Sequence, residues 1–308
     1  MRVTIACLLV SAAMSAQSSQ LTTLRRVEEI TLGRALDAAF WQRRAPDKRL
    51  QWDGHFLKGL RGQTYVAFTV RINAAGDAFR SVSVGIRAVG RMTRWNDAFA
   101  VETDRSGDAR IFRGALSVTP GPCRVLIAIQ DRNARGRESD PVLLDQRITV
   151  PDFSGHRLQM SSVVVANRID DVPGGISDKE RKAYPYAFGS ANVVPVPAGA
   201  FTTNETLTVA FQVYNVAMFE DGKPDVEVNY EVFREGATEE PVGRTQPQTF
   251  NQETVPEEFT LKTGFQLTPI QSLPLSQFEP GTYRLAIEVD DVLGNARVRA
   301  DVPFTVSP

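Results

Sequence analysis

The chain has 308 residues, of which 42% are hydrophobic and 23% charged, as in an ordinary globular protein long enough for two domains. No run after the first residues approaches the roughly 20 apolar residues of a membrane helix, which excludes a transmembrane segment of that kind. The net charge of −1 hides an asymmetry. Residues 17–150 carry 22 Lys and Arg against 14 Asp and Glu, whereas residues 151–308 carry 12 against 22. Either surface composition drifts along the chain, or the first half offers a basic face to an anionic partner or to the acidic half of another copy.

The first residues, "MRVTIACLLVSAAMSAQSSQ", place Arg2 before a short apolar run and then small residues. This layout predicts a signal peptide over residues 1–16, cleaved after Ala16, and a protein exported to the periplasm or the extracellular space. Cys7 lies inside the apolar run rather than at its end, which disfavours a lipoprotein. Cys123 then remains alone without a disulfide partner, and we expect it to be a small buried hydrophobe.

An N-terminal helical segment is expected over residues 17–50. Within it, "TLGRALDAAFWQRR" (31–44) repeats Leu32, Leu36 and Phe40 every fourth residue, which predicts a short amphipathic helix. Trp41, Arg43 and Arg44 would also suit a helix on a membrane surface. We favour a helix that packs on its own domain.

The phrase "PGPCRVLIAIQD" (120–131) returns 160 positions later as "PGTYRLAIEVDD" (280–291). In both copies Pro-Gly predicts a turn, and the alternating apolar residues that follow predict a half-buried strand. Tyr283, just after its turn, has the position of the tyrosine corner of immunoglobulin-type (Ig) sandwiches. Cys123 takes that place in the earlier copy, so we expect no corner hydrogen bond there.

A second pair of early strands, "YVAFTVRI" (65–72) and "LTVAFQVYN" (207–215), supports two related β-units. The predicted fold is therefore all-β, with two tandem Ig-like antiparallel β-sandwiches and a short N-terminal helix. We expect the first sandwich over residues 51–155 and a second, larger one over 156–308. The extra length of the second sandwich predicts a surface loop over 233–259. A polar linker between the two sandwiches is expected around 150–160 and 169–185.

Candidates for catalysis are few. His156 stands two residues after Ser154 and four after Asp152, but neighbours on a linker rarely converge as the members of a hydrolase triad do. His55, in "WDGHFLKG", is expected in a turn before the first strand. Neither a G-x-S-x-G elbow nor a phosphate-binding loop occurs. We predict that the protein is not an enzyme and that it has no catalytic residue and no cofactor.

Metal ligands are equally scarce, because two histidines and one remaining cysteine at wide separation give no zinc pattern. The carboxylate pairs could bind calcium, although neither has the spacing of a calcium loop; they are Asp170 with Asp171 and Asp290 with Asp291. Asp291 precedes a turn, where an aspartate often caps its own backbone. We predict no metal site and leave calcium at these pairs open.

The stretch "GIRAVGRMTRW" places Arg87, Arg91 and Arg94 close to Trp95. Such a cluster suits an anionic envelope glycan or an acidic protein face, while export disfavours nucleic acid. Arginine on solvent-facing strand positions is also ordinary.

Several longer phrases carry a family resemblance, among them "VLLDQRITVPDFSGHRLQMSSVVVANRID", "YPYAFGSANVVPVPAGAFTTNETLTVAFQVYN" and "LPLSQFEPGTYRLAIEVDD". Over roughly residues 50–306 the chain resembles tandem Ig-like domains of uncharacterised secreted acidobacterial proteins. It is similar as well to the region that follows the von Willebrand factor A-like domain in some acidobacterial proteins. The resemblance implies the sandwich fold and export, and it carries no activity. At this position such proteins resemble "PGDY", whereas this chain has Cys123 in place of the tyrosine. The difference concerns the packing of this side chain.

The favoured function is that of a non-catalytic binding or scaffolding protein of the cell envelope, whose partner is a protein or an envelope glycan bound by residues that the sequence leaves unknown. One alternative is a carbohydrate-binding module, which needs Trp52, Trp95 and Tyr214 as an exposed row. Another is an unrecognised hydrolase with His55 or His156 in a pocket. The identity of the partner and the oligomeric state stay open.

Overall fold

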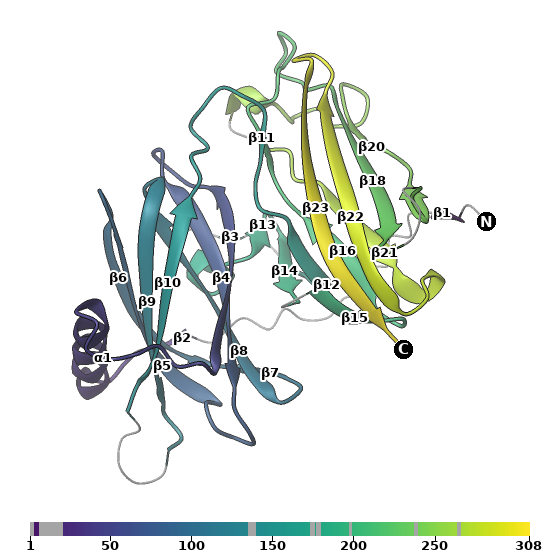
Figure 1. The fold of residues 1–308 in the computed structure, drawn as a ribbon. Helices are drawn as coiled ribbons and strands as arrows, with labels where there is room; N and C mark the ends of the chain where they lie inside the picture. Colours follow the sequence, from purple (N-terminus) through teal and green to yellow (C-terminus); the bar gives the residue numbers. More distant parts are fainter. Residues whose placement is uncertain are drawn as a thin grey trace. The chain divides into compact units, whose positions relative to one another are not determined.

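The computed structural model describes residues 3–5, 21–134, 140–172, 176, 180–196, 199–236, 240–263 and 266–308. The chain is all-β: among the described residues it has one α-helix, three short 3-10 helices and several mainly antiparallel sheets (Figure 1). It divides into two compact units. The first unit comprises Ala16–Ser154 and Gly174–Ala187, and the second comprises Met1–Ser15, Gly155–Pro173 and Phe188–Pro308.

The first unit holds two sheets. One has the strand order β10-β9-β5-β6-β2 and the other the order β3-β4-β8-β7. The strands are β2 (Leu21–Thr22), β3 (Leu50–Lys58), β4 (Thr64–Asn73), β5 (Ser81–Gly90), β6 (Arg94–Glu102), β7 (Asp104–Ser106), β8 (Ala109–Val118), β9 (Gly121–Asp131) and β10 (Val142–Val150). Alternate residues of β4, β5, β8 and β9 fill the core between the sheets.

Helix α1 (Arg26–Phe40) lies on the outer face of the five-stranded sheet. Leu32 and Leu36 pack on Leu126 of β9, so this strand is buried on both faces and reads as a continuous apolar run. Gly85 of β5 makes room for the helix, because a Cβ there would lie 3.1 Å from the Cβ of Leu32. The expectation that the helix packs on its own domain is therefore confirmed.

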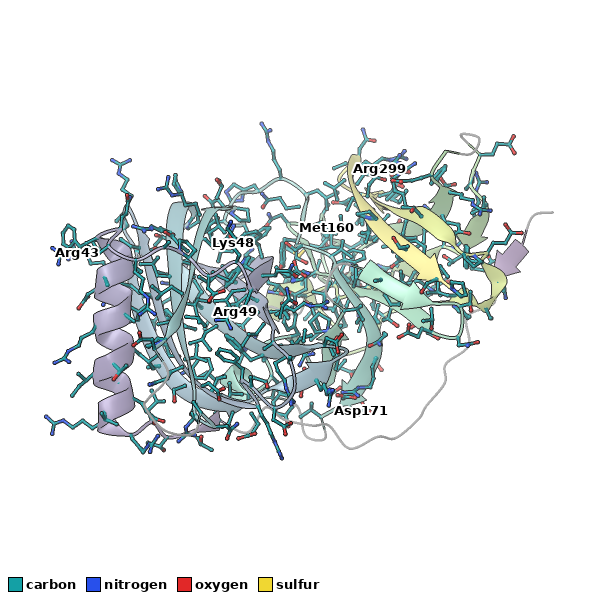
Figure 2. All side chains as sticks on the ribbon, turned by 60° about the horizontal axis from the view of Figure 1, so that its bottom comes forward. Arg43, Lys48, Arg49, Met160, Asp171 and Arg299 are labelled. Atoms are coloured by element: carbon teal, nitrogen blue, oxygen red, sulfur yellow. The ribbon has the colours of Figure 1, made fainter. Side chains whose placement is uncertain are left out.

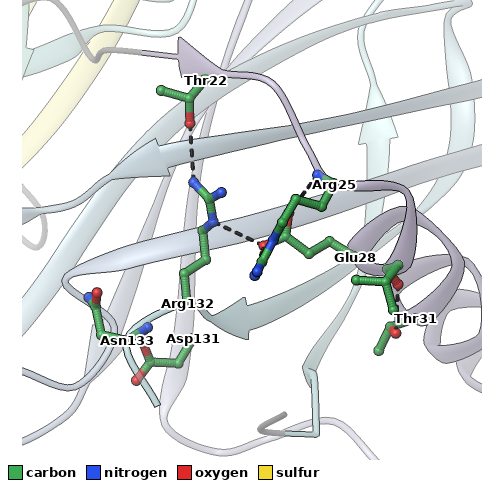
Figure 3. Close-up of polar contacts among 8 residues, drawn as sticks. Thr22, Arg25, Glu28, Thr31, Asp131, Arg132 and Asn133 are labelled. Carbon is green, nitrogen blue, oxygen red and sulfur yellow. Dashed lines mark hydrogen bonds and ion pairs between the residues drawn. The ribbon is translucent and has the colours of Figure 1, made fainter. Parts of the chain in front are cut away.

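A buried carboxylate fixes the start of α1 (Figure 3). Glu28 accepts hydrogen bonds from the backbone N–H of Arg25 at 2.7 Å, from the Arg25 guanidinium at 2.9 Å and from Arg132 Nε at 3.0 Å. Arg132 follows β9 and also donates to Thr22 of β2. Burial alone would raise the pKa of Glu28, but the hydrogen bonds from Arg25 and the charge of Arg132 lower it to about 2.

The second unit also holds two larger sheets, with the orders β1-β19-β18-β22-β23-β15 and β13-β14-β12-β16-β21; β20 pairs with β18, and β11 with β17. The strands are β1 (Val3–Ile5), β11 (Gln159–Met160), β12 (Val164–Asp171), β13 (Ala187–Phe188), β14 (Ala191–Pro195), β15 (Ala200–Thr202), β16 (Thr206–Ala210), β17 (Val213–Tyr214), β18 (Val226–Arg234), β19 (Gly243–Thr245), β20 (Gln248–Phe250), β21 (Ile270–Pro274), β22 (Gly281–Asp291) and β23 (Ala296–Ser307). The second unit has the 3-10 helices Leu261–Thr263 and Leu275–Gln277, and the first unit has Glu180–Lys182. Alternate residues of β16, β18 and β22 form this unit's core.

The two copies of the repeated phrase form equivalent strands. β9 and β22 each pair antiparallel with the strand that follows, β10 and β23. Tyr283 is buried, stacks on Phe304 and donates its hydroxyl to the carbonyl of Glu279 at 2.7 Å, so the predicted tyrosine corner is confirmed. Cys123 is buried at the matching position of β9, as expected, and burial raises the pKa of its thiol.

Four sequence expectations differ from the structure. The helix spans 26–40 rather than 31–44, because Glu28 caps its start and Gln42, in the left-handed region at φ 56°, follows its end. Part of the expected loop over 233–259 forms β19 and β20 against β18. Part of the expected join forms β11 and β12. The predicted range 156–308 differs at Gly174–Ala187, which belongs to the first unit. Apart from Val3–Ile5, the predicted signal peptide lies outside the described residues.

Replacing Glu28 with glutamine should lower the free energy of unfolding at pH 7 by about 1–3 kcal/mol, because the variant leaves Arg132 without its charged acceptor. Ionised Glu28 stabilises the fold above its ordinary pKa of 4.5, and this contribution is lost as the pH falls through its folded pKa of about 2. Urea unfolding should therefore show a difference between wild type and Glu28→Gln that shrinks between pH 4.5 and 2. Glu29→Gln, at the exposed next position, is the control and should change little.

Candidate functional site

The residues with the most potential for chemistry gather on the outer face of the β3-β4-β8-β7 sheet. Register places His55 of β3 beside Ala67 and Asp53 beside Thr69 on the same face of β4. Thr69 in turn pairs with Arg113 of β8. His55 therefore lies within a strand, and the expectation of a turn is wrong.

Tyr186, from the returning segment 180–187, covers this face. Its hydroxyl lies 3.1 Å from His55 Nδ1 and 3.2 Å from Thr69 Oγ1, and its ring meets the imidazole edge to face. None of these three side chains is more than 8% exposed. Burial lowers the pKa of His55, although the charge of Asp53 opposes the shift, and burial raises the pKa of Tyr186. At neutral pH the trio is an uncharged imidazole, phenol and hydroxyl.

Further contacts hold segment 180–187 on the first unit. Tyr65 donates its hydroxyl to the carbonyl of Pro185 at 3.1 Å, and the guanidinium of Arg181 lies over the Tyr65 ring. Lys182 forms an ion pair with Asp97 of β6 at 2.6 Å. Since the three side chains hydrogen bond through the Tyr186 hydroxyl and lie under this segment, their role is to fasten the segment to the sheet. The arrangement offers no exposed nucleophile or base.

Asp152 and Ser154, which were not expected to form a triad with His156, make a local contact. Asp152 accepts hydrogen bonds from the N–H and hydroxyl of Ser154, at 2.8 and 2.6 Å, which lower its pKa. This is a local turn of the kind that aspartate makes with its own backbone. His156 is exposed two residues further on.

Three of the four carboxylates considered for calcium are engaged in separate contacts. Asp170 is buried and pairs with Arg168 at 2.8 Å, while Asp171 is exposed at the end of β12 (Figure 2). Asp290 pairs with Arg297. Asp291 accepts the N–H groups of Gly294 at 2.9 Å and Ala217 at 2.8 Å, so its predicted capping role is confirmed. Among the described residues, no three His, Cys, Asp or Glu side chains gather as a metal site would require.

The arginine cluster is exposed only in part, and the aromatic row does not form. Arg87 pairs with Asp37 of α1 at 2.7 Å, whereas Arg91 and Arg94 are exposed around the turn between β5 and β6. Trp95 and Trp52 are half-buried and pack against the first unit's core, Trp52 stacking on Phe68 at 4.4 Å. Tyr214 is buried in the second unit. These three aromatics therefore form no exposed row.

In the part of the chain that the structure describes, no helix has the length and apolar character to cross a bilayer. Tyr186 and Thr69 were not among the candidate residues predicted from the sequence. The only signal for Tyr186 was the aromatic density of "YPYAF", and nothing in that string says which strand it covers.

No known protein family and no curated protein matches the chain. Among solved structures, a β-glucuronidase of Bacteroides uniformis is similar with 14% identity over 83% of this chain and 32% of its own, at a TM-score of 0.24. Bacteroides uniformis β-glucuronidase 2, covalently bound to cyclophellitol-6-carboxylate aziridine, is similar with 13% identity over the same shares, at a TM-score of 0.23. The chain spans 32% of each enzyme. A structural similarity this small carries no argument about the activity of the present chain.

Because His55 is buried as a neutral base, the unfolded chain binds a proton that the folded chain excludes. Stability should therefore fall as the pH drops below the ordinary histidine value of 6.5, by at most about 1.4 kcal/mol per pH unit. His55→Gln keeps a polar group near Tyr186 and should flatten this dependence between pH 7.5 and 5 in chemical unfolding. His156→Gln should follow wild type. Parallel curves for wild type and His55→Gln would contradict the buried neutral state.

Proposed function

We propose that this is an exported, non-catalytic binding or scaffolding protein of the cell envelope, which recognises a protein partner through its Ig-like units. The N-terminal sequence supports export, and the engagement of His55, Asp152 and Asp291 in structural contacts supports a role other than catalysis. Binding then depends on surfaces rather than on a pocket.

The observation that carries this proposal is the edge of β6. Strand β5 pairs with β6 along its whole length, from Ser81 opposite Glu102 to Val89 opposite Arg94. On the other side β2 covers only Ala100 and Val101. Among the described residues, 94–99 therefore have no neighbouring strand on that side. An open strand edge recognises an extended peptide by adding it to the sheet.

Local contacts suit such an edge. Ala98 donates its N–H to its neighbour's carboxylate, Asp97 Oδ1, at 2.9 Å, a bond that the carbonyl of an added strand could replace. Lys182 pairs with Asp97 and brings a positive charge beside the strand. Lysine at an edge opposes indiscriminate pairing, so a partner must complement this charge.

The carbohydrate alternative lacks the exposed row of Trp52, Trp95 and Tyr214 on which it depended. The anionic-glycan alternative depended on the arginine cluster, in which Arg87 is paired with Asp37.

The hydrolase alternative lacks an accessible histidine beside a carboxylate: His55 is covered, and Asp152 hydrogen bonds with Ser154. All three alternatives are less well supported than recognition of a protein.

The substitution Ala98→Pro removes the backbone N–H that donates to Asp97 and blocks the addition of a strand. The substitution Ala98→Ser keeps this N–H. Chemical crosslinking in an envelope extract of the host should join wild type and Ala98→Ser to the same protein. With Ala98→Pro, the amount of this crosslinked product should fall to less than half. Thermal unfolding would verify that the proline variant is folded. Equal crosslinking by Ala98→Pro would rule out the β6 edge as the recognition surface.

A further inference from the structure

Three large apolar side chains stand out from the rest of the surface. Met92 is 83% exposed, Leu60 73% and Trp41 67%, more than any other large hydrophobic residue among those described. All three belong to the first unit. Each has arginine close in sequence: Arg91 and Arg94 flank Met92, Arg61 follows Leu60, and Arg43 and Arg44 follow Trp41.

Tight turns hold two of these side chains at hairpin tips. Gly90 donates its N–H to the carbonyl of Thr93 at 3.0 Å, which leaves Arg91 and Met92 as the turn between β5 and β6. Between β3 and β4, Gly59 donates to Gln63 at 2.9 Å and Arg61 takes a φ of 54°. Leu60 and Arg61 thus occupy the tip of a second hairpin.

Sheet register brings these turns to one end of the first unit. Thr64, at the start of β4, pairs with Val118 at the end of β8. The next residue, Thr119, donates its N–H to the hydroxyl of Thr93 at 3.0 Å, which joins the two hairpin ends.

The end of α1 lies toward the same side. Arg124, near the start of β9, pairs with Val89 near the end of β5 and donates to the carbonyls of Ala39 and Phe40 at 3.0 Å. Arg43 follows, beyond the end of the helix (Figure 2). We call Trp41, Arg43, Leu60, Arg61, Arg91 and Met92 the arginine–apolar patch.

The patch has few opposing charges. Arg43, Arg61 and Arg91 take part in none of the ion pairs formed by the described residues. The turns at 41–46, 59–63 and 91–93 contain no Asp or Glu. Asp152 follows β10 at this end, and its carboxylate accepts hydrogen bonds from Ser154.

The opposite end of the unit is different. Its turns, 74–80 and 103–108, mix both signs of charge, and carboxylates there pair with arginines, as Asp77 does with Arg110 at 3.3 Å. Three arginines without an ion pair among the described residues, Arg43, Arg61 and Arg91, therefore lie at the end that carries the exposed apolar tips.

We propose that the arginine–apolar patch docks the first unit on an anionic lipid surface. Arginine at the ends of hairpins pairs with phosphate of the headgroups, and the indole of Trp41 suits the boundary between headgroups and acyl chains. Leu60 and Met92 insert at the same level, which removes their apolar surface from water. A soluble polyanion would use the arginines and leave the three apolar side chains exposed, and for that reason the lipid surface is the better fit.

Flotation with phospholipid vesicles tests this inference on the full chain. Wild type should float with vesicles of phosphatidylcholine and phosphatidylglycerol in equal parts, and much less with phosphatidylcholine alone. Removing three charges in Arg43→Ser/Arg61→Ser/Arg91→Ser should weaken binding to the anionic vesicles roughly 100-fold, at about fivefold per arginine. Leu60→Ser/Met92→Ser should also weaken it, by at least about tenfold.

Matched controls remove similar side chains elsewhere. Arg105→Ser/Arg157→Ser/Arg299→Ser removes three exposed arginines, and Val292→Ser/Leu293→Ser removes two exposed apolar residues at the turn between β22 and β23. Both should float like wild type. The apolar N-terminal stretch is the same in every variant, so differences between variants report the patch.

Three outcomes would overturn the proposal. The first is equal flotation of wild type with neutral and anionic vesicles, and the second is unchanged flotation of the triple-arginine variant. The third is binding to soluble polyphosphate that needs the arginines, together with vesicle binding that is unaffected by Leu60→Ser/Met92→Ser; this would identify a polyanion site instead. Because none of the variants changes residues 94–99, the proposal for the β6 edge and the proposal for the patch are tested separately.

Discussion

Burial of apolar side chains between two β-sheets is the constraint on which each unit depends. In β9 and β22, alternate residues from the third to the ninth position face a core, and each fully buried valine, leucine or isoleucine contributes roughly 1.5–3 kcal/mol. With Cys123 unpaired and the described chain free of disulfides, this packing is the main source of stability. The similar sequences at 120–131 and 280–291 reflect this requirement, because each places apolar residues at alternate positions of a core strand in its unit.

The same constraint decides what happens to polar groups in the interior. A buried carboxylate or imidazole is tolerated only with partners, and the fold supplies them at Glu28, His55, Asp170 and Asp291. Three of these groups fix a part of the chain that apolar packing alone does not fix: Glu28 the start of α1, His55 the returning segment 180–187, and Asp291 a turn. Asp170 pairs with Arg168 within its own strand. The hydrogen bonds and ion pairs of these groups therefore stabilise the fold. We assign recognition instead to the strand edges and hairpin tips.

The sequence predicted what depends on local pattern. Alternation identified the strands around residues 65–72, 121–131 and 281–291, and the position of Tyr283 after Pro-Gly identified the tyrosine corner. It failed at His55, which was expected in a turn before the first strand. In the structure Gly54 lies mid-strand and leaves space for the indole of Trp52, whose Nε1 would lie 2.6 Å from a Cβ there.

Other features were beyond local pattern. Tyr186 meets His55 across 131 positions of sequence, and no period or spacing encodes such a contact. The arginine–apolar patch likewise joins turns that lie far apart in the chain, and only the register of β4, β5, β8 and β9 shows that they share one end.

The central claim is that the potentially reactive groups are structural and that the surface carries the function. The most direct measurement is the crosslinking of partners by a folded His55→Gln/His156→Gln variant in an envelope extract, compared with wild type. The account predicts the same crosslinked partner in the same amount, since neither histidine lies on the proposed recognition surfaces. Loss of the partner in this variant, while Ala98→Pro retains it, would contradict the account and return attention to the histidines.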